Sequence, residues 1–385
     1  MKRYRTSEAV CPGHPDKICD QIADAIVEAY MKQDAEARVA VEVAISYQTV
    51  FIMGEVTSQV SLDIEALARQ VIREIGYDQA TYGFCYDQIQ VLIDLHSQSP
   101  DIARGVSKYQ ELGAGDQGIM YGYATDETID YLPLPFVLAT KLAKRLTELG
   151  RTKQIPYLRP DGKVQVTMCY EEDTPQYVEA VVLSTQHDPD ISFAQLRYDL
   201  ELVMKEVIPE VYMTLETKML INPTGRFVIG GPVADSGVTG RKLMVDTYGG
   251  FALHGGGAFS GKDPTKVDRT AAYYARYVAK NIVASKLARR VTIGVSYAIG
   301  VAKPLAITID THHTGRVDDA IILKVIDQVF CFEPKHMILE LRMTTLPYQT
   351  LATFGHFGRV ELDLPYERLD KVEQIETLLA DQNLI

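Results

Sequence analysis

Residues 38–57 read RVAVEVAISYQTVFIMGEVT, and they fix the smallest unit of the fold. Arg38–Tyr47 and Val50–Thr57 either alternate apolar with polar residues or contain runs of β-branched residues. This pattern is typical of two paired strands. The preceding segment, Lys17–Lys32, places apolar residues at helical spacing, and Leu62–Gly76 does so again, with Gly76 as a plausible C-cap. Gln90–His96 then predicts a strand. The order is helix, strand, strand, helix, strand.

The same order recurs twice along the chain, which predicts an internal repeat. The second copy comprises Pro135–Gly150, Val164–Tyr170, Tyr177–Gln186, Phe193–Val207 and Lys218–Ile221. The third comprises a helix over Pro264–Leu287 with Asp263 as its N-cap, strands over Val291–Ile299 and Leu305–Thr311, a helix over Asp319–Phe330, and a possible last strand over Met337–Met343. We therefore predict an α/β protein of α+β type, with three similar domains. Each domain would hold a mainly antiparallel sheet with helices on one face.

The predicted domain ranges are 1–100, 112–230 and 231–369. Two glycine-rich connections, Gly105–Gly122 and Gly225–Gly261, lie between or beside the repeated units. Connections of this length without regular structure usually carry function. We therefore expect the chemistry to lie between domains.

Composition restricts the classes of function. The chain has 385 residues and a formal net charge of −12, which argues against a nucleic-acid binder. Its five cysteines lack CxxC spacing, so we expect a reducing compartment and no disulfide framework. No run approaches eighteen apolar residues, and no signal peptide is recognisable. We expect a cytoplasmic protein that binds neither nucleic acid nor membrane.

Two glycine motifs suggest nucleotide chemistry, and each leaves alternatives open. Gly113–Gly118 matches GxGxxG, but the flanking residues do not predict the strand and helix that a dinucleotide site requires. Gly256–Lys262 reads GGAFSGK, yet Asp263 stands where a P-loop has Ser or Thr. We expect Lys262 to start a helix, with Lys266 on the same face and Asp268 beyond. These residues suit a polyphosphate–magnesium complex, although a solvated basic helix start would also explain the lysines.

Other candidate residues are ambiguous when taken singly. Asp16 in the GHPDK motif at 13–17 could merely cap a helix, and His14 could be a surface residue. Glu42 and Glu55 interrupt apolar strands, where they either face water or need a partner. Further candidates lie in the glycine-rich stretch: Arg226, Phe227, Asp235, Arg241 and Lys242.

Eight ordered motifs resolve this ambiguity. They are GHPDK at 13–17, QSPDI at 98–102, GAGDQG at 113–118, LRPDGK at 158–163, NPTGRFVIGGP at 222–232, GRKLMVDTYGG at 240–250, HGGGAFSGKDPTKVDR at 254–269 and GHFGR at 355–359. Over nearly its whole length the chain resembles the S-adenosylmethionine synthetase (methionine adenosyltransferase) family. The resemblance implies three pseudo-threefold-related domains. It also implies a homotetramer of dimers with active sites at the dimer interface, and a mobile gating loop at 98–112.

The resemblance also implies a role for each matched residue. His14, Lys163, Arg241, Lys242, Lys262 and Lys266 would surround the ATP phosphates, and His14, Lys163, Arg241, Lys262 and Lys266 would be catalytic. Asp116, Asp161, Arg226, Phe227, Asp235 and Ala258 would also contact ATP. Glu55, Gln98, Asp235 and Lys266 would contact L-methionine. Two Mg²⁺ ions per site would be held by Asp16 and Asp268, and one K⁺ ion per subunit by Glu42.

The implied reaction is attack of the methionine sulfur on C5′ of ATP, followed by hydrolysis of the bound triphosphate to pyrophosphate and phosphate. A thioether has no proton to lose, which suits a sequence without a recognisable Ser-His-Asp or Cys-His arrangement. Two other interpretations stay open: an ATP-dependent kinase or NTPase that uses 256–262, and a nucleotide-binding regulatory subunit. A kinase or NTPase would turn over without methionine.

Overall fold

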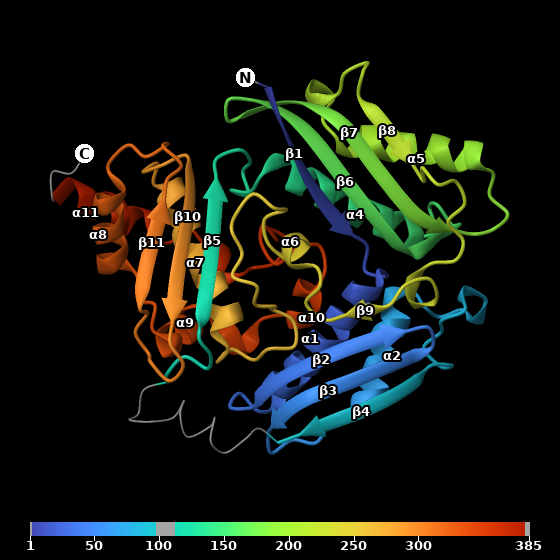
Figure 1. Cartoon of the computed structure of the whole chain (residues 1–385), viewed down its shortest axis with the longest axis horizontal. Coiled ribbons are helices and arrows are strands. Elements are labelled where there is room, and N and C mark those ends of the chain that lie inside the picture. Colours follow the sequence, from blue (N-terminus) through green and yellow to red (C-terminus); the bar gives the residue numbers. More distant parts are fainter. Residues whose placement is uncertain (1, 98–111, 382–385) are drawn as a thin grey trace.

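The computed structural model describes residues 2–97 and 112–381. Three separate sheets surround a central helix, α1, and each sheet carries its own helices (Figure 1). The predicted fold class is thereby confirmed.

The first repeated unit follows its predicted order. Gly76 has φ +112°, the left-handed conformation expected of a glycine C-cap, and its N–H bonds to the last turn of the helix. The unit consists of α1 (Pro15–Gln33), β2 (Arg38–Ser46), β3 (Thr49–Thr57), α2 (Ile64–Ile75) and β4 (Gln90–His96).

The second and third units repeat this order, except that the third has no final strand in the described residues. The second consists of α4 (Leu134–Arg151), β6 (Leu158–Glu171), β7 (Thr174–His187), α5 (Phe193–Val207) and β8 (Lys218–Ile221). The third consists of α7 (Val267–Ala284), β10 (Arg290–Tyr297), β11 (Ala306–Asp310) and α8 (Asp319–Val329).

Three strands that the sequence pattern did not predict complete the three sheets, and each comes from a segment outside the repeated unit that it joins. β1 (Lys2–Val10) pairs with β6, β5 (Gly118–Thr125) with β10, and β9 (Gly237–Val238) with β2, each antiparallel. The sheet orders are β4-β3-β2-β9, β1-β6-β7-β8 and β11-β10-β5. Each sheet therefore receives an edge strand from a part of the chain outside its own repeated unit.

Two predicted elements are wrong. Residues 337–343 do not form a strand, because α9 (Pro334–Glu340) covers most of them. A short apolar run is compatible with both a helix and a strand. Here the helix is favoured by Pro334 at its start and by the burial of Met337 and Leu341, which lie four residues apart. The predicted loop over Gly105–Gly122 also ends early, since β5 already begins at Gly118.

Short helices fill the connections. They are α6 (Leu243–Asp246), α10 (Tyr348–Leu351), α11 (Val372–Asp381) and the 3₁₀ turns Ala80–Tyr82, Glu210–Tyr212, Gly231–Val233, Met343–Thr345 and Pro365–Glu367. None of the described helices is long and apolar enough to cross a membrane.

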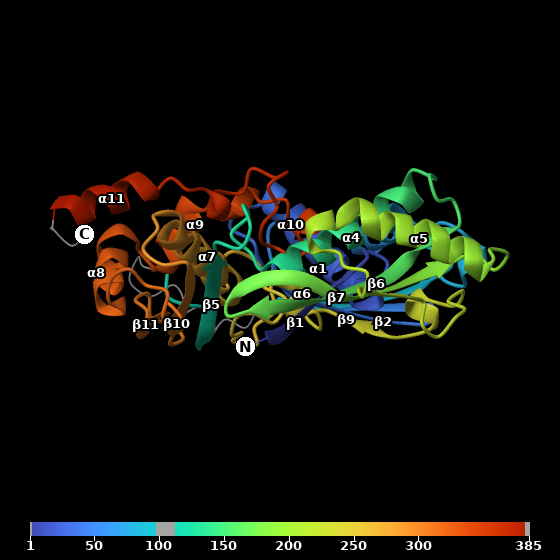
Figure 2. The ribbon, with the colours of Figure 1, turned by 90° about the horizontal axis from the view of Figure 1, so that it is seen from above.

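The molecule has a helical side and a sheet side. Figure 2 shows the helices along one side and the strands along the other. One hydrophobic core joins the first and third sheets to α1, α2 and α7, and a second lies between the middle sheet, α4 and α5. Fifteen of the nineteen residues of α1 are buried, so polar groups on this helix must find protein partners.

Candidate active site

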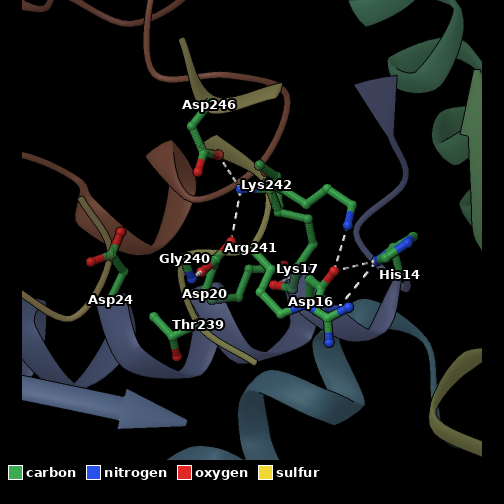
Figure 3. A network of polar contacts seen from close by, with 12 residues as sticks. His14, Asp16, Lys17, Asp20, Asp24, Thr239, Gly240, Arg241, Lys242 and Asp246 are labelled. Carbon is green, nitrogen blue, oxygen red and sulfur yellow. Dashed lines mark hydrogen bonds and ion pairs between the residues drawn. The ribbon is translucent and has the colours of Figure 1, made fainter. Parts of the chain in front are cut away.

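The first group of predicted residues gathers at the start of α1. His14 is the N-cap, and its Nδ1 accepts a hydrogen bond from the Asp16 N–H at 3.2 Å. Asp16 Oδ2 lies 2.5 Å from Lys242 Nζ, and its Oδ1 lies 3.6 Å from Arg241 Nε. Figure 3 shows these side chains converging from α1 and from the loop before α6. The structure thus brings the pair His14 and Asp16 to the pair Arg241 and Lys242, more than 220 positions further along the chain.

The charge states in this group follow from burial and from neighbouring charges. Burial and the adjacent Lys242 lower the pKa of His14 to about 4, so the imidazole is neutral at pH 7. Burial pushes the pKa of Asp16 upward, but hydrogen bonds from Lys242 and the Val238 N–H hold it below its usual value. Asp16 is therefore an anion between two cations.

Strand β6 supplies two more predicted residues beside this group. Asp161 is buried and accepts a hydrogen bond from the Gly231 N–H at 2.8 Å, while burial raises its pKa to about 6. Lys163 lies half exposed, 3.9 Å from Glu8. The charges of Lys163 and Asp235 both affect the pKa of His14, which places them near the same end of α1.

A second group lies at the start of α7, where a further prediction is wrong. The helix begins at Val267 with Lys266 as its N-cap, so Lys262 precedes the helix and shares no helical face with Lys266. Lys262 Nζ lies 2.5 Å from Asp268 Oδ2, whereas Lys266 Nζ lies 3.2 Å from Asp263 Oδ2. The two lysines are therefore held by different carboxylates.

Asp263 has a different role from the predicted helix cap. It is fully buried, and its Oδ2 accepts the Val39 N–H of β2 at 2.8 Å. Its Oδ1 accepts the N–H of Thr265, also at 2.8 Å. Asp263 thus fastens the loop before α7 to the first sheet, because a buried carboxylate needs several donors.

The glycines beside this group allow close packing. A Cβ atom added to Gly257 would lie 2.4 Å from Cγ of Asp268. A Cβ atom on Gly115 would lie 3.2 Å from the Thr265 carbonyl oxygen, so Asp116, which is exposed, stands next to the second group. These glycines keep room around the carboxylates.

Two predicted carboxylates lie on the outer face of the first sheet. Glu42 on β2 is partly buried, and burial raises its pKa against the opposing effect of Lys262. Glu55 on β3 lies 3.5 Å from Nε2 of His96 on β4. Both point away from α1, because the alternating residues of these strands face the helix.

The remaining predicted residues lie on loops. Arg226 and Asp235 are exposed, and the backbone of Phe227 bonds to His187. Ala258 packs against Gly240, where an added Cβ atom would lie 2.6 Å from the Ala258 Cβ. Gln98 and most of the predicted gating loop lie outside the described residues.

The two groups stay separate within one chain. Among the described residues, no hydrogen bond or ion pair joins the charged side chains of the α1 group to those of the α7 group. A cavity of about 240 Å³ between the ends of α2 and α4 contains none of the predicted residues. The predicted cations and carboxylates are therefore divided between two groups, one at the start of α1 and one at the start of α7.

Comparison with known proteins shows which family the chain belongs to. Sequence models of the S-adenosylmethionine synthetase N-terminal, central and C-terminal domains match residues 2–100, 111–227 and 229–368. The chain belongs to the S-adenosylmethionine synthetase family. Membership confirms the resemblance inferred from the motifs, and it makes the chain an enzyme of the methionine adenosyltransferase class.

Curated S-adenosylmethionine synthases are similar over almost their full length. The protein of Petrotoga mobilis is 51% identical, covering 98% of this chain and 99% of its own. Those of Clostridium botulinum and Finegoldia magna are each 49% identical with the same coverage.

Several polar residues of this S-adenosylmethionine synthetase chain escaped the sequence argument. Lys17, Asp20, Asp24 and Arg269 are fully buried beneath the two groups. A signal was present, since acidic residues recur every fourth position from Asp16 to Glu28 on a helix whose other positions are mostly apolar. Such spacing predicts one helical face but does not reveal that this face is buried.

Proposed function

We propose that the chain makes S-adenosylmethionine from ATP and L-methionine. The methionine sulfur forms a bond to C5′ as the C5′–O bond breaks, and the triphosphate leaves with the electron pair. Water then hydrolyses the bound triphosphate to pyrophosphate and phosphate. The observation that carries this proposal is the gathering of cations against glycine-rich loops in a chain about half identical to proteins named S-adenosylmethionine synthase.

The chemistry requires alignment and charge stabilisation more than a base. The sulfur nucleophile has no proton to lose, while the leaving triphosphate gains negative charge. We assign His14, Lys163, Arg241, Lys262 and Lys266 as catalytic groups around the phosphates, with Lys242 beside them. Loss of one such contact typically costs about 2.7–4 kcal/mol of transition-state stabilisation.

His14 suits this role as a neutral hydrogen-bond donor. Its Nδ1 accepts the Asp16 N–H, so the proton of the neutral ring sits on Nε2. Because its pKa is about 4, the ring carries no charge at pH 7. We therefore assign Nε2–H as a donor to a phosphate oxygen.

Substrate contacts are assigned to residues beside the cations. ATP would contact Asp116, Asp161, Arg226, Phe227, Asp235 and Ala258. L-Methionine would contact Glu55, Gln98, Asp235 and Lys266. The acidic members offset the charge of the cationic cluster and can bind the methionine ammonium group.

The carboxylates fit the proposed metal ions. No group of three or more His, Cys, Asp or Glu side chains is gathered as a metal site in the described residues. Mg²⁺ is usually held by one or two carboxylates together with substrate phosphates and water, so single carboxylates suffice. Asp16 and Asp268 would hold two Mg²⁺ ions, and Glu42 would offer oxygen to K⁺. Bound Mg²⁺ supplies neutralisation of phosphate charge.

We further propose that the site forms between two copies of the chain, within a homodimer or a homotetramer of dimers. The outer face of the first sheet exposes Leu92, 43% accessible, beside half-buried Phe51 and Met53. Glu42 and Glu55 lie on this same face. Apolar surface beside functional carboxylates is typical of an interface, and a second copy could bring one chain's α1 group to the other's α7 group.

One assay tests the activity. Purified chain would be incubated with ATP, L-methionine, Mg²⁺ and K⁺, and the products separated. We expect S-adenosylmethionine, pyrophosphate and phosphate in equal amounts. ADP as product, or turnover that is equally fast without methionine, would support a kinase or NTPase instead and overturn the proposal.

A further inference from the structure

Three carboxylates on one face of α1 hold the backbone of the two loops that carry the site cations. Asp16 Oδ1 accepts the Val238 N–H at 3.0 Å, and Asp20 Oδ1 accepts the Gly240 N–H at 2.9 Å. Asp24 Oδ1 accepts the Gly261 N–H at 2.9 Å. Gly240 directly precedes Arg241 and Lys242, and Gly261 directly precedes Lys262. The bonds to Asp20 and Asp24 therefore each fix the chain one residue before a cation.

Buried cations hold the carboxylates of Asp20 and Asp24 in this orientation. Lys17 Nζ donates to Asp20 Oδ2 at 2.9 Å and also pairs with Asp246. Arg269 binds Asp24 through both oxygens, at 2.8 and 2.6 Å. Arg269 also donates to the Lys262 carbonyl oxygen at 3.1 Å, so it fixes the second loop from its other side. Figure 3 shows Asp16, Asp20 and Asp24 in line along α1.

The helix sets the spacing of these bonds. Residues four apart on a helix lie about 6 Å apart along its axis. Because α1 is packed in the core, the loop before Lys242 and the loop before Lys262 are each held at a defined place along it. Asp20 and Asp24 are completely buried and so cannot touch a substrate themselves.

We infer that Asp20 and Asp24 are positioning residues, each of which holds one cationic loop in place on α1 for polyphosphate binding. The inference rests on the proposed function, since it takes a polyphosphate as the ligand. It goes beyond that function because it assigns roles to residues beneath the site that contact only the protein.

Two variants remove these bonds without leaving a buried cation unpaired. Asp20→Ala deletes the acceptor of the Gly240 N–H, but Lys17 keeps Asp246 as its partner. The double variant Asp24→Leu/Arg269→Met deletes the acceptor of the Gly261 N–H and replaces the buried ion pair by apolar groups, so that no charge is orphaned. Asp20→Asn keeps an acceptor oxygen and serves as the conservative rescue.

Glu28→Ala is the matched control. Glu28 is the next residue on the same face of α1, but it accepts the Gln349 N–H of α10 at 2.9 Å, away from both loops. Removing this hydrogen bond tests whether the loss of any contact of α1 weakens polyphosphate binding.

Tripolyphosphate with Mg²⁺ is the probe, and its affinity for the full chain would be measured by calorimetry beside the unfolding temperature. We expect Asp20→Ala and the double variant to weaken binding at least about tenfold, with Asp20→Asn closer to wild type. Glu28→Ala should bind within about twofold of wild type. Wild-type affinity in folded Asp20→Ala, or equal weakening in Glu28→Ala, would overturn the inference.

A second measurement needs no variant. Amide hydrogen exchange of the wild-type chain should show the Gly240 and Gly261 N–H groups protected like those of α1, although both lie in loops. Rapid exchange at both would overturn the inference even if every variant failed to fold. If the wild type binds tripolyphosphate but makes no S-adenosylmethionine, the proposed function fails while the positioning role stands.

Discussion

Lys262 forms an ion pair with Asp268, and a ligand that binds Lys262 must displace this ion pair. Its Nζ lies 2.5 Å from Asp268, just as that of Lys242 lies 2.5 Å from Asp16. Under the proposed function both carboxylates hold Mg²⁺ and both lysines face phosphate. Binding would therefore exchange two ion pairs for charge-assisted bonds to the ligand.

Lys262→Ala should reduce S-adenosylmethionine formation by about 10²–10³-fold, because it removes one donor to the leaving triphosphate. The fold should persist, since the side chain is partly exposed and Asp268 remains accessible to water. Initial rates and the unfolding temperature would be measured together. Lys218→Ala, which breaks only a surface pair with Glu179, is the control and should keep full activity. An unchanged rate in Lys262→Ala would remove this lysine from the mechanism.

Asp161→Asn should stabilise the fold above pH 6. Burial raises the pKa of Asp161 to about 6, so the folded state pays for a buried anion at higher pH. The difference from the unfolded value near 3.9 corresponds to about 3 kcal/mol at most. As the pH falls through 6 the folded state binds a proton that the unfolded state does not bind, so the cost shrinks progressively until the pH reaches the unfolded pKa near 3.9. The stabilisation measured by urea unfolding should shrink from pH 8 to pH 5. A difference independent of pH would contradict this account.

At the scale of elements, the loop before Lys262 passes unusually close to β2. Gly261 has φ +82°, and a Cβ atom there would lie 1.9 Å from the Val41 carbonyl oxygen. The Val41 N–H in turn bonds to the Gly261 carbonyl oxygen at 2.9 Å. Only glycine satisfies both the positive φ and this contact.

Gly261→Ala should therefore lower the free energy of unfolding by more than a Gly→Ala substitution that introduces only the strain of a positive φ. Gly250 offers a matched control, because its φ is +86° and no atom lies within 4 Å of an added Cβ. We expect Gly250→Ala to cost about 1 kcal/mol and Gly261→Ala about 3 kcal/mol or more in urea unfolding. Equal costs would mean that the loop moves freely away from β2.

At the scale of the whole molecule, the separation of the α1 and α7 groups makes the proposed shared site testable. Lys242 belongs to the first group and Lys262 to the second. If each site takes one group from each of two chains, a mixed dimer of Lys242→Ala and Lys262→Ala has one doubly altered site and one intact site.

Mixing the two inactive variants after unfolding and refolding should then restore about a quarter of wild-type activity, because half of the dimers are mixed and half of their sites are intact. Each variant refolded alone is the control and should stay inactive. Sites contained within single chains would give no recovery, since every site would carry one substitution.

Most of the local elements and the identity of the candidate residues follow from the order of the amino acids alone. Period-2 and period-3.6 patterns predicted the strands at 38–57 and the helices on either side, because burial of one face imposes these periods. The motifs gave the family, and with it residues such as Asp16 and Lys262, whose individual patterns were ambiguous.

The pairing of the strands and the contacts that hold the loops became visible only in the folded chain. β1, β5 and β9 each pair with a strand that is distant in the sequence. The pattern of apolar residues in a strand indicates which face is buried, but it does not indicate which strand lies beside it. Pairing depends on hydrogen bonds between segments that the fold brings together. Likewise Asp20 and Asp24 resemble a solvated helix face in the sequence. They became loop-holding carboxylates only because α1 lies at the centre, where buried charges require partners.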